Sequence, residues 1–252
     1  MKQVPNLFTL LNLVFGCIAI VCILQTGETL LERDGASWIA RLPEKIWWGA
    51  IFIGCAALID FLDGFVARML KAESAMGKEL DSLADVVSFG VAPGLILYQM
   101  LRISYISEET ALDTPMAYLL PAVIFPCAAA YRLARFNTSD YDKPGFRGVP
   151  VPAAGLVAAS YPLILLYYPG IAVTILNKWM VYLVIIALSW LMVSNLPLMS
   201  LKFKDYSFKN NFRRYLLVII ALIAALLLNW LAIPVIFIVY LVLSLISPKN
   251  NA

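Results

Sequence analysis

Residues 60–85 read DFLDGFVARMLKAESAMGKELDSLAD, a stretch whose charged and glycine residues separate two long apolar segments. One apolar segment begins near residue 46 and runs into this stretch as far as residue 68, and the other begins within it near residue 80 and ends near residue 101. Each has about 20 residues, the length that an α-helix needs to cross a bilayer. The stretch therefore predicts two antiparallel membrane helices, 46–68 and 80–101, joined by a short turn near residues 71–77.

The rest of the chain is apolar in the same way. Hydrophobic residues make up 62% of the 252 residues and charged residues only 14%, which lies outside the usual balance of a soluble domain. We expect an all-α, polytopic membrane helix bundle of about eight transmembrane helices, with little room for a separate soluble domain. The eight apolar stretches are 7–24, 46–68, 80–101, 116–135, 151–168, 171–195, 212–230 and 232–247.

The hydrophilic connections differ in positive charge on the two sides of such a bundle. With the N-terminus placed inside, fourteen Lys and Arg residues fall on the inner side and five on the outer side. Because basic residues are retained on the cytoplasmic side, both termini and the turn at 71–77 are expected there. In a bacterium the membrane would be the inner membrane. The net charge of +3 calls for no further partner, and no nucleic acid is expected.

Four aspartates in residues 60–85 fall on two helix faces. Asp60 and Asp63 are three residues apart, and Asp81 and Asp85 are four apart, so each pair lies on one side of its helix. Antiparallel packing then brings all four carboxylates toward one cavity near the inner surface. A single Asp at the bilayer centre costs ~2.5–3.5 kcal/mol on insertion scales. The set therefore requires compensating positive charge.

Divalent cations with oxygen ligands would supply that charge. We expect two Mg2+ or Mn2+ ions about 3.5–4 Å apart, which could bridge a diphosphate and hold it for in-line attack. Gly64 and Gly77 let a nucleotide approach the helix backbone, and Ala67 keeps the same face shallow. The alternatives are that Gly64 only packs helices together and that the acids are half-exposed residues at a helix boundary.

As a pattern, the stretch is Asp-x2-Asp-Gly-x2-Ala-Arg-x8-Gly-x3-Asp-x3-Asp, with eight specified positions. This pattern resembles, without departure, the signature of the CDP-alcohol phosphatidyltransferase family. The resemblance implies transfer of a phosphatidyl group from CDP-diacylglycerol to a small alcohol. It also implies a six-helix core, a cytidine nucleotide against the second and third helices, a divalent-metal pair and, as is usual in the family, a homodimer. The family domain would cover 1–200, followed by a C-terminal transmembrane helix pair over 201–252.

Through this resemblance, roles carry over residue by residue. Asp60, Asp63 and Asp81 would be metal ligands, and Asp85 would be a ligand or the general base for the incoming hydroxyl. A positioned carboxylate can accept that proton in the transition state. CDP-diacylglycerol would be bound by Asn6, Thr9, Gly64, Ala67, Arg68 and Gly77. Asn6 could equally be a helix cap.

The acceptor alcohol has to be inferred from residues beyond the signature. The candidates lie at the inner end of the fourth predicted helix, 116–135, and in the loop beyond it, and they are Arg132, Arg135, Asn137 and Arg147. The arginines offer forked donors suited to a carboxylate or a phosphate. Electrostatics therefore leaves serine, glycerol 3-phosphate and inositol phosphate open. The alternative for Arg132 and Arg135 is positive-inside anchoring.

Four short segments favour one of these acceptors by resemblance. They are NLFTLLN (6–12), VSFGVAP (87–93), RLARFN (132–137) and FRGVPVPA (146–153). Together they resemble the membrane-embedded phosphatidylserine synthases, which implies L-serine as the acceptor. An alternative from another class is a cation channel or transporter, in which acidic residues line a path. A path would place acids at several depths, whereas these cluster on two helices.

Overall fold

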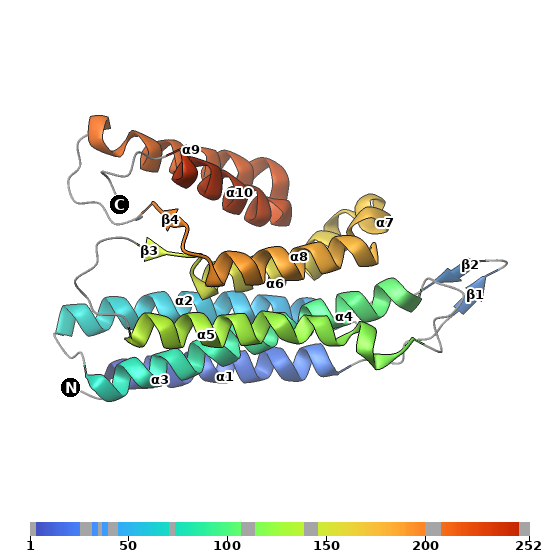
Figure 1. The fold of residues 1–252 in the computed structure, drawn as a ribbon, viewed down its shortest axis with the longest axis horizontal. Coiled ribbons are helices and arrows are strands. Elements are labelled where there is room, and N and C mark those ends of the chain that lie inside the picture. The colour runs from blue at the N-terminus through green and yellow to red at the C-terminus, as the bar shows by residue number, and fades with distance from the viewer. Residues whose placement is uncertain are drawn as a thin grey trace.

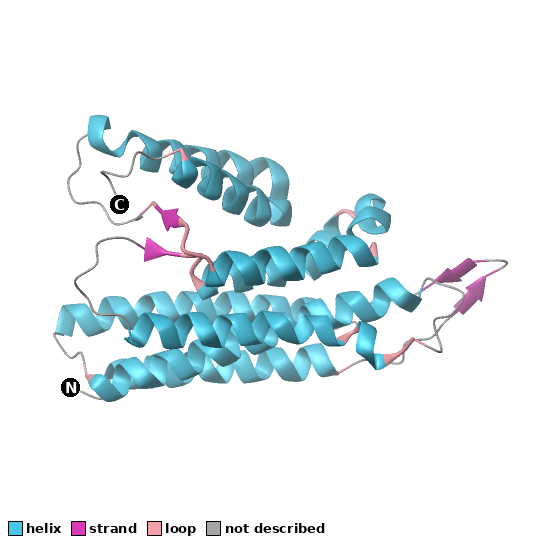
Figure 2. Cartoon of the chain, in the orientation of Figure 1, coloured by secondary structure: helices cyan, strands magenta, loops and turns pink. Residues whose placement is uncertain are grey.

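The computed structural model of the chain describes residues 4–25, 32–34, 37–39, 45–70, 74–106, 114–138, 146–199 and 208–246. Helices dominate these residues, and most of them run along one common direction (Figure 1). The strands are short and lie in connections, as the secondary-structure colouring in Figure 2 shows. The predicted all-α helix bundle is therefore confirmed.

The described residues of the first half of the chain form five α-helices. They are α1 (Val4–Leu24), α2 (Ile46–Leu70), α3 (Ala75–Asp85), α4 (Ala92–Ile106) and α5 (Ile124–Thr138). A π-helical segment, Val86–Val91, joins α3 to α4, and two 3-10 turns, Met116–Tyr118 and Leu120–Val123, lead into α5. Strands β1 (Glu32–Asp34) and β2 (Ser37–Ile39) pair antiparallel between α1 and α2. The predicted helical hairpin is present, with α3, the π segment and α4 as its second arm.

The second half continues with α6 (Val151–Tyr167), α7 (Ala172–Ile175), α8 (Lys178–Val193), α9 (Phe208–Leu228) and α10 (Ala232–Leu245). A 3-10 turn, Pro169–Ile171, precedes α7, and another, Asn229–Leu231, separates α9 from α10. Strands β3 (Phe146–Arg147) and β4 (Pro197–Leu198) pair antiparallel. They join the start of α6 to the end of α8, because Gly148 N and Val149 N donate to carbonyl oxygens of Leu196 and Leu191, both at 3.0 Å.

Within the described residues, five helical segments are long and apolar enough to cross a membrane, or six if a bent pair counts as one span. The bent pair is α6 with the segment Pro169–Ile175, which meet at 112°. The apolar stretch predicted as one helix over 171–195 is therefore divided between α7 and α8. Helix α8 has 16 residues, about 24 Å at 1.5 Å per residue, which is shorter than a typical hydrocarbon core of ~30 Å.

The segment Asn211–Leu245 passes the same length test as a single stretch of 35 residues. The chain nevertheless reverses within it at Asn229, whose φ is 44°. Helices α9 and α10 consequently lie side by side as a hairpin (Figure 1). The chain is a multi-pass integral membrane protein, and the number of eight crossings stays a prediction.

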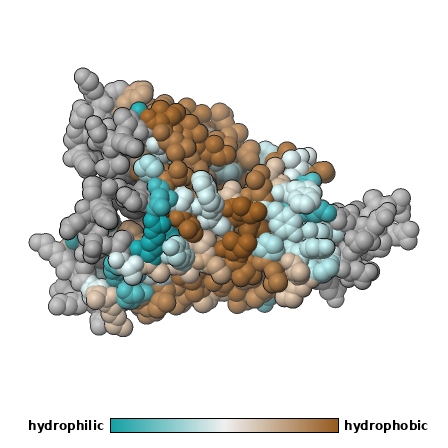
Figure 3. All heavy atoms as spheres, viewed as in Figure 1, coloured by the Kyte–Doolittle hydropathy of each residue, from teal (hydrophilic) through white to brown (hydrophobic). Residues whose placement is uncertain are grey.

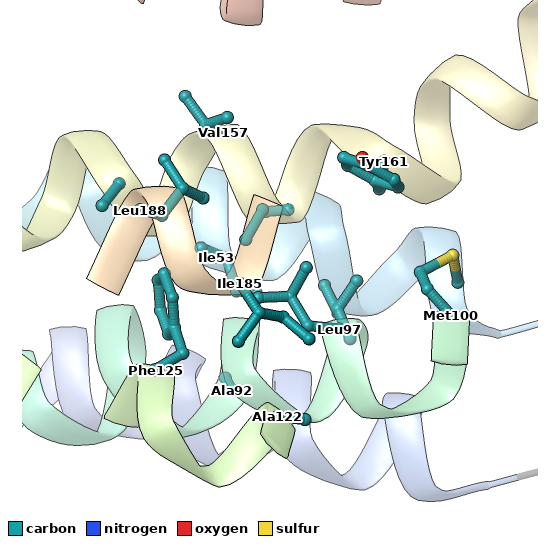
Figure 4. Close-up of a cluster of buried hydrophobic side chains, with 14 of the residues drawn as sticks. Ile53, Ala92, Leu97, Met100, Ala122, Phe125, Val157, Tyr161, Ile185 and Leu188 are labelled. Carbon is teal, nitrogen blue, oxygen red and sulfur yellow. The ribbon is translucent and has the colours of Figure 1, made fainter. Parts of the chain in front are cut away.

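The apolar side chains divide between a core and an outer surface. Figure 4 shows the core where α4, α5, α6 and α8 meet, with Leu97, Phe125, Val157 and Ile185 among its members. Large apolar side chains are also exposed along the helices, for example Leu226 on α9. They form much of the face in Figure 3, with hydrophilic residues toward its ends. This distribution is the one that burial in a bilayer requires.

The π segment is held by close approach of two neighbouring helices. A Cβ added to Gly16 of α1 would lie 2.3 Å from Ser88 Oγ, and one added to Gly155 of α6 would lie 2.8 Å from the Phe89 carbonyl oxygen. Glycine at both positions therefore allows α1 and α6 to touch the π segment. Because this segment begins directly after Asp85, its packing influences the orientation of α3, and so of Asp81 and Asp85, relative to the other helices.

Candidate metal centre

Three aspartates come together where α2 faces α3. Asp60 and Asp63 lie on α2 and Asp81 on α3, and one carboxylate oxygen from each lies within 4.8 Å of the others. Ser74 helps to set this arrangement, because its Oγ caps α3 by accepting from Gly77 N at 3.0 Å. The predicted convergence of carboxylates from two adjacent helices is thus present for these three residues.

The surroundings of the three carboxylates suit a hard cation. Thr9 Oγ1 on α1 donates to Asp63 Oδ2 at 3.0 Å, which orients one carboxylate. Asp81 Oδ1 is buried and has no hydrogen-bond partner among the described residues. Buried oxygen atoms normally have a partner, and carboxylate oxygens are the ligands that Mg2+, Mn2+ and Ca2+ prefer. The donor set therefore fits a divalent metal ion.

Asp85 lies outside this group of three. It is the last residue of α3, only 7% exposed, and its Oδ1 accepts a hydrogen bond from Asn12 Nδ2 at 3.4 Å. Asp85 is still close enough to Asp60 and Asp81 to interact with them electrostatically. The arrangement separates three clustered carboxylates from a fourth that is held by an amide of α1.

The residues predicted to bind the nucleotide have different settings. Asn6 approaches Gly77, since a Cβ on this glycine would lie 3.0 Å from Asn6 Oδ1. A Cβ on Gly64 would meet no atom of the described residues within 4 Å, so α2 has open space at that position in the described structure. Arg68 is exposed near the end of α2. Ala67 lies on α2 as well, but its side chain is outside the described part of the structure.

The predicted acceptor residues do not all point to one place. Asn137 Nδ2 on α5 donates to Ser82 Oγ at 2.8 Å, next to Asp81. Arg132 lies with its guanidinium carbon 5.6 Å from the centroid of the Phe136 ring and is within electrostatic reach of Asp85. Arg132 therefore lies near Asp85, and Asn137 contacts the helix that carries Asp81 and Asp85.

Arg135 and Arg147 are placed differently. Arg135 Nη1 donates to the Val193 carbonyl oxygen at 3.1 Å, and its Nη2 donates to Asn195 Oδ1, so this guanidinium holds the end of α8. Arg147 pairs through its backbone with Pro197 in the β3–β4 pair. Its side chain lies outside the described residues.

Sequence reasoning assigned no role to Asn12, Ser82 or Asn195. Asn12 had a detectable signal, because it follows Thr9 by three residues and so shares its face of a helix that is otherwise apolar. Ser82 and Asn195 had none, since ordinary polar residues near helix ends are usually solvated. Their contacts with α5 come from packing between segments distant in sequence.

Comparison with known proteins identifies the class to which this fold and site belong. The family model described as CDP-alcohol phosphatidyltransferase matches residues 2–203. The match covers most of the chain, including the four aspartates. The chain belongs to the CDP-alcohol phosphatidyltransferase family, and the resemblance seen in residues 60–85 is confirmed.

Individual relatives carry one name, CDP-diacylglycerol--serine O-phosphatidyltransferase. The protein of Bacillus subtilis (strain 168) is 33% identical over 157 residues, covering 62% of this chain and 73% of the relative. That of Mycobacterium bovis (strain ATCC BAA-935 / AF2122/97) is 36% identical over 202 residues, covering 75% of this chain and 64% of the relative. That of Helicobacter pylori (strain ATCC 700392 / 26695) is 30% identical over 220 residues, covering 86% and 79%.

Proposed function

We propose that this protein transfers the phosphatidyl group of CDP-diacylglycerol to L-serine, giving phosphatidylserine and CMP. The observation that carries the proposal is the convergence of Asp60, Asp63 and Asp81, three aspartates of the family signature, within 4.8 Å. The choice of serine is supported by the relatives named above, which match this chain at 30–36% identity. Glycerol 3-phosphate or inositol phosphate would be the acceptor in the alternative with the same chemistry.

Asp60, Asp63 and Asp81 would hold the divalent ions, with Asp85 available as a further ligand. We propose two ions, Mg2+ or Mn2+. When bound, they would neutralise the diphosphate and the charge that develops on the leaving phosphate. Thr9 would keep the Asp63 carboxylate oriented through its 3.0 Å hydrogen bond. Asn6, Thr9, Gly64, Ala67, Arg68 and Gly77 would line the nucleotide site, which the open space at Gly64 supports.

Asp85 would act as the general base. The serine hydroxyl gives its proton to the Asp85 carboxylate while its oxygen bonds to the phosphorus that carries the diacylglycerol. The bond from this phosphorus to the bridging oxygen of the diphosphate breaks, and CMP leaves with that oxygen. Position supports this role, because Asp85 stands apart from the three clustered carboxylates yet within their electrostatic range. Such proton transfer typically contributes about 10²–10⁴-fold in rate.

Arg132, Asn137 and Arg147 would bind the serine carboxylate and orient the acceptor. For Arg132 and Asn137, closeness to Asp85 and to Ser82 supports this assignment. The contacts of Arg135 with Val193 and Asn195 favour an anchoring role for this residue, which would fix α5 against the end of α8.

The proposed topology follows the distribution of basic residues. Eight crossings would place both termini and the carboxylates on the cytoplasmic side, which in a bacterium is the inner face of the inner membrane. Residues 1–200 would form the catalytic domain with its six-helix core, and 201–252 a C-terminal helix pair. A homodimer is the expected assembly within the family.

An acceptor panel with purified protein tests the proposed function. CDP-diacylglycerol labelled in the phosphatidyl group would be incubated with L-serine, glycerol 3-phosphate or inositol phosphate, with Mn2+, Mg2+ or EDTA. Metal-dependent CMP release and labelled phosphatidylserine are expected with serine alone. Turnover with a phosphorylated alcohol and none with serine would replace the acceptor while keeping the chemistry. Absence of CMP release with all three would overturn the proposal.

A further inference from the structure

Helix α1 places an amide beside Asp85. Asn12 is 0% exposed, and its Nδ2 donates to Asp85 Oδ1 at 3.4 Å. Three residues earlier, Thr9 makes the corresponding contact with Asp63. One face of this mostly apolar helix therefore holds two of the four signature carboxylates.

Asn12 is itself fixed against the segment that follows Asp85. Ser88 Oγ in the π segment donates to the Asn12 carbonyl oxygen at 3.1 Å. One turn further along α1, Gly16 lies so close that a Cβ would come within 2.3 Å of Ser88 Oγ. The backbone of Asn12 and the backbone just after Asp85 are thus held together by a hydrogen bond and by close packing.

Packing alone does not explain an asparagine at this position. Within the part of the chain that the structure describes, Asn12 Oδ1 is buried and has no hydrogen-bond partner. A buried carbonyl oxygen without a partner destabilises the folded state. A leucine would fill a similar volume without this cost. The bond to Asp85 is the contact that a leucine could not make.

We propose that Asn12 is a positioning residue that orients Asp85 for proton transfer. The proposal rests on the role of Asp85 as general base given under the proposed function. By donating to Oδ1, Asn12 fixes the plane of the carboxylate and leaves Oδ2 to receive the proton of the acceptor hydroxyl. A general base must lie within hydrogen-bond reach of the proton that it takes, and a displacement of about 1 Å can cost about 10²-fold in rate.

The chain offers a matched control in Gln99 of α4. This amide is 3% exposed, its Nε2 donates to the Ile23 carbonyl oxygen of α1 at 3.2 Å, and its Oε1 is buried without a partner in the described structure. Like Asn12, it is a buried amide that donates one hydrogen bond from one helix to another, but its partner lies near the C-terminal end of α1 and not among the carboxylates. Gln99→Leu and Asn12→Leu therefore remove equivalent groups at different places.

The experiment compares Asn12→Leu, Gln99→Leu and Asp85→Asn by kcat, by KM for both substrates and by melting temperature without substrate. For Asn12→Leu we expect kcat to fall about 10–100-fold, with KM for CDP-diacylglycerol changed by less than about 2-fold and no loss of melting temperature. For Gln99→Leu we expect kcat within about 2-fold of the unchanged protein. Ser88→Ala removes only the anchor of Asn12, so it should lower kcat by a smaller factor with the same constant KM.

Each outcome decides the inference. If Asn12→Leu keeps its kcat while Asp85→Asn is inactive, the positioning role of Asn12 is overturned and the role of Asp85 as base stands. If Asp85→Asn retains turnover, the role of Asp85 as general base is overturned. Equal losses of kcat in Asn12→Leu and Gln99→Leu, or a fall in melting temperature that accounts for the lost activity, identify a structural role and overturn the inference. If Asn12→Leu does not fold, Ser88→Ala decides: unchanged kcat there overturns the inference, and reduced kcat at constant KM supports it.

Discussion

The two ends of the bundle use polar side chains differently. At the end where α3 begins and α5 finishes, Thr9 and Asn12 of α1 hydrogen-bond to carboxylates, and Asp81 Oδ1 stays without a partner among the described residues. At the opposite end, Tyr182 hydrogen-bonds to two other tyrosines. The Tyr105 and Tyr182 hydroxyls lie 2.9 Å apart, and Tyr182 Oη donates to the Tyr118 carbonyl oxygen at 2.6 Å.

This difference separates sites that serve chemistry from sites that serve stability. The Tyr182 hydroxyl joins α4, the turn before α5 and α8, and Lys178 Nζ lies 5.1 Å from the centre of the Tyr105 ring, so these elements meet without a group of like charges. The aspartates repel one another, and Asp81 Oδ1 has no hydrogen-bond partner among the described residues, which destabilises the folded chain. Substitutions at the aspartate end should change activity more than stability, and those at the tyrosine end the reverse.

The largest effect is expected from Asp81→Asn, which removes a charge from the group of three carboxylates. Loss of metal binding would remove several kcal/mol of transition-state stabilisation, about 10³-fold or more in kcat/KM. CMP release measures this loss. Glu79→Gln on the same helix is the control, because Glu79 is exposed, and it should retain full activity. Equal losses in both variants would contradict a specific role for Asp81.

The same pair of variants separates metal binding from catalysis. Because a ligand that binds only the folded state raises its stability, Mn2+ or Mg2+ should raise the melting temperature of the unchanged protein and of Glu79→Gln. Asp81→Asn should show no such increase. A metal-dependent increase in Asp81→Asn equal to that of the control would show that the ions bind elsewhere.

A smaller effect is expected from Thr9→Val, which keeps the shape of the side chain and removes its hydrogen bond to Asp63. Residues that orient metal ligands typically contribute about 10–100-fold to metal affinity or activity. The measurement is the metal concentration that gives half-maximal activity, which should rise about 10-fold. Thr174→Val on α7, where Thr174 is exposed, should leave it unchanged. An unchanged metal requirement in Thr9→Val would show that the bond does not orient Asp63.

At the other end, Tyr182→Phe should reduce stability and leave kcat unchanged. The substitution deletes a hydroxyl with two hydrogen-bond contacts, which corresponds to about 1–2 kcal/mol and a melting temperature lower by about 3–5 °C. Tyr167→Phe is the control, since Tyr167 is exposed. A fall in kcat without a fall in melting temperature would break the proposed contrast between the two ends.

The smallest effect is expected from Tyr240→Phe in the α9–α10 hairpin. Its hydroxyl donates to the Met199 carbonyl oxygen at 3.1 Å and helps to attach the hairpin to the segment after β4. Because the hydroxyl is only half-buried, its loss should cost about 1 kcal/mol or less. The melting temperature should fall by less than in Tyr182→Phe, with activity unchanged. Lost activity would assign the hairpin a part in the reaction.

Much of the site follows from sequence because it depends on local spacing. Asp60 and Asp63 share a face of one helix and Asp81 lies on the adjacent one, so helical periodicity and a short turn are sufficient to predict that they meet. The break between α7 and α8 is harder to predict, because the residues around it are mostly apolar. The signal is Asn177, which caps α8 by accepting from Trp179 N at 3.0 Å, and a single asparagine does not by itself indicate a helix end.

Other features depend on tertiary packing and could not be predicted in this way. The direction of Arg135 is set by Val193 and Asn195, nearly sixty residues later in the chain. The π segment depends on the approach of α1 and α6 at Gly16 and Gly155. No local pattern in residues 86–91 distinguishes it from α-helix.

The π segment also sets the angular phase between two parts of one continuous helical rod. Successive residues of an α-helix are rotated by about 100°, so one residue more or fewer between Asp85 and α4 would turn the aspartates relative to the side chains of α4 that enter the core. Deleting a single residue from Val86–Val91 would leave the helix continuous but would rotate Asp81 and Asp85 of α3 away from Asp60 and Asp63 of α2. The wider turn thus lets one rod face the carboxylates of α2 along α3 and an apolar core along α4.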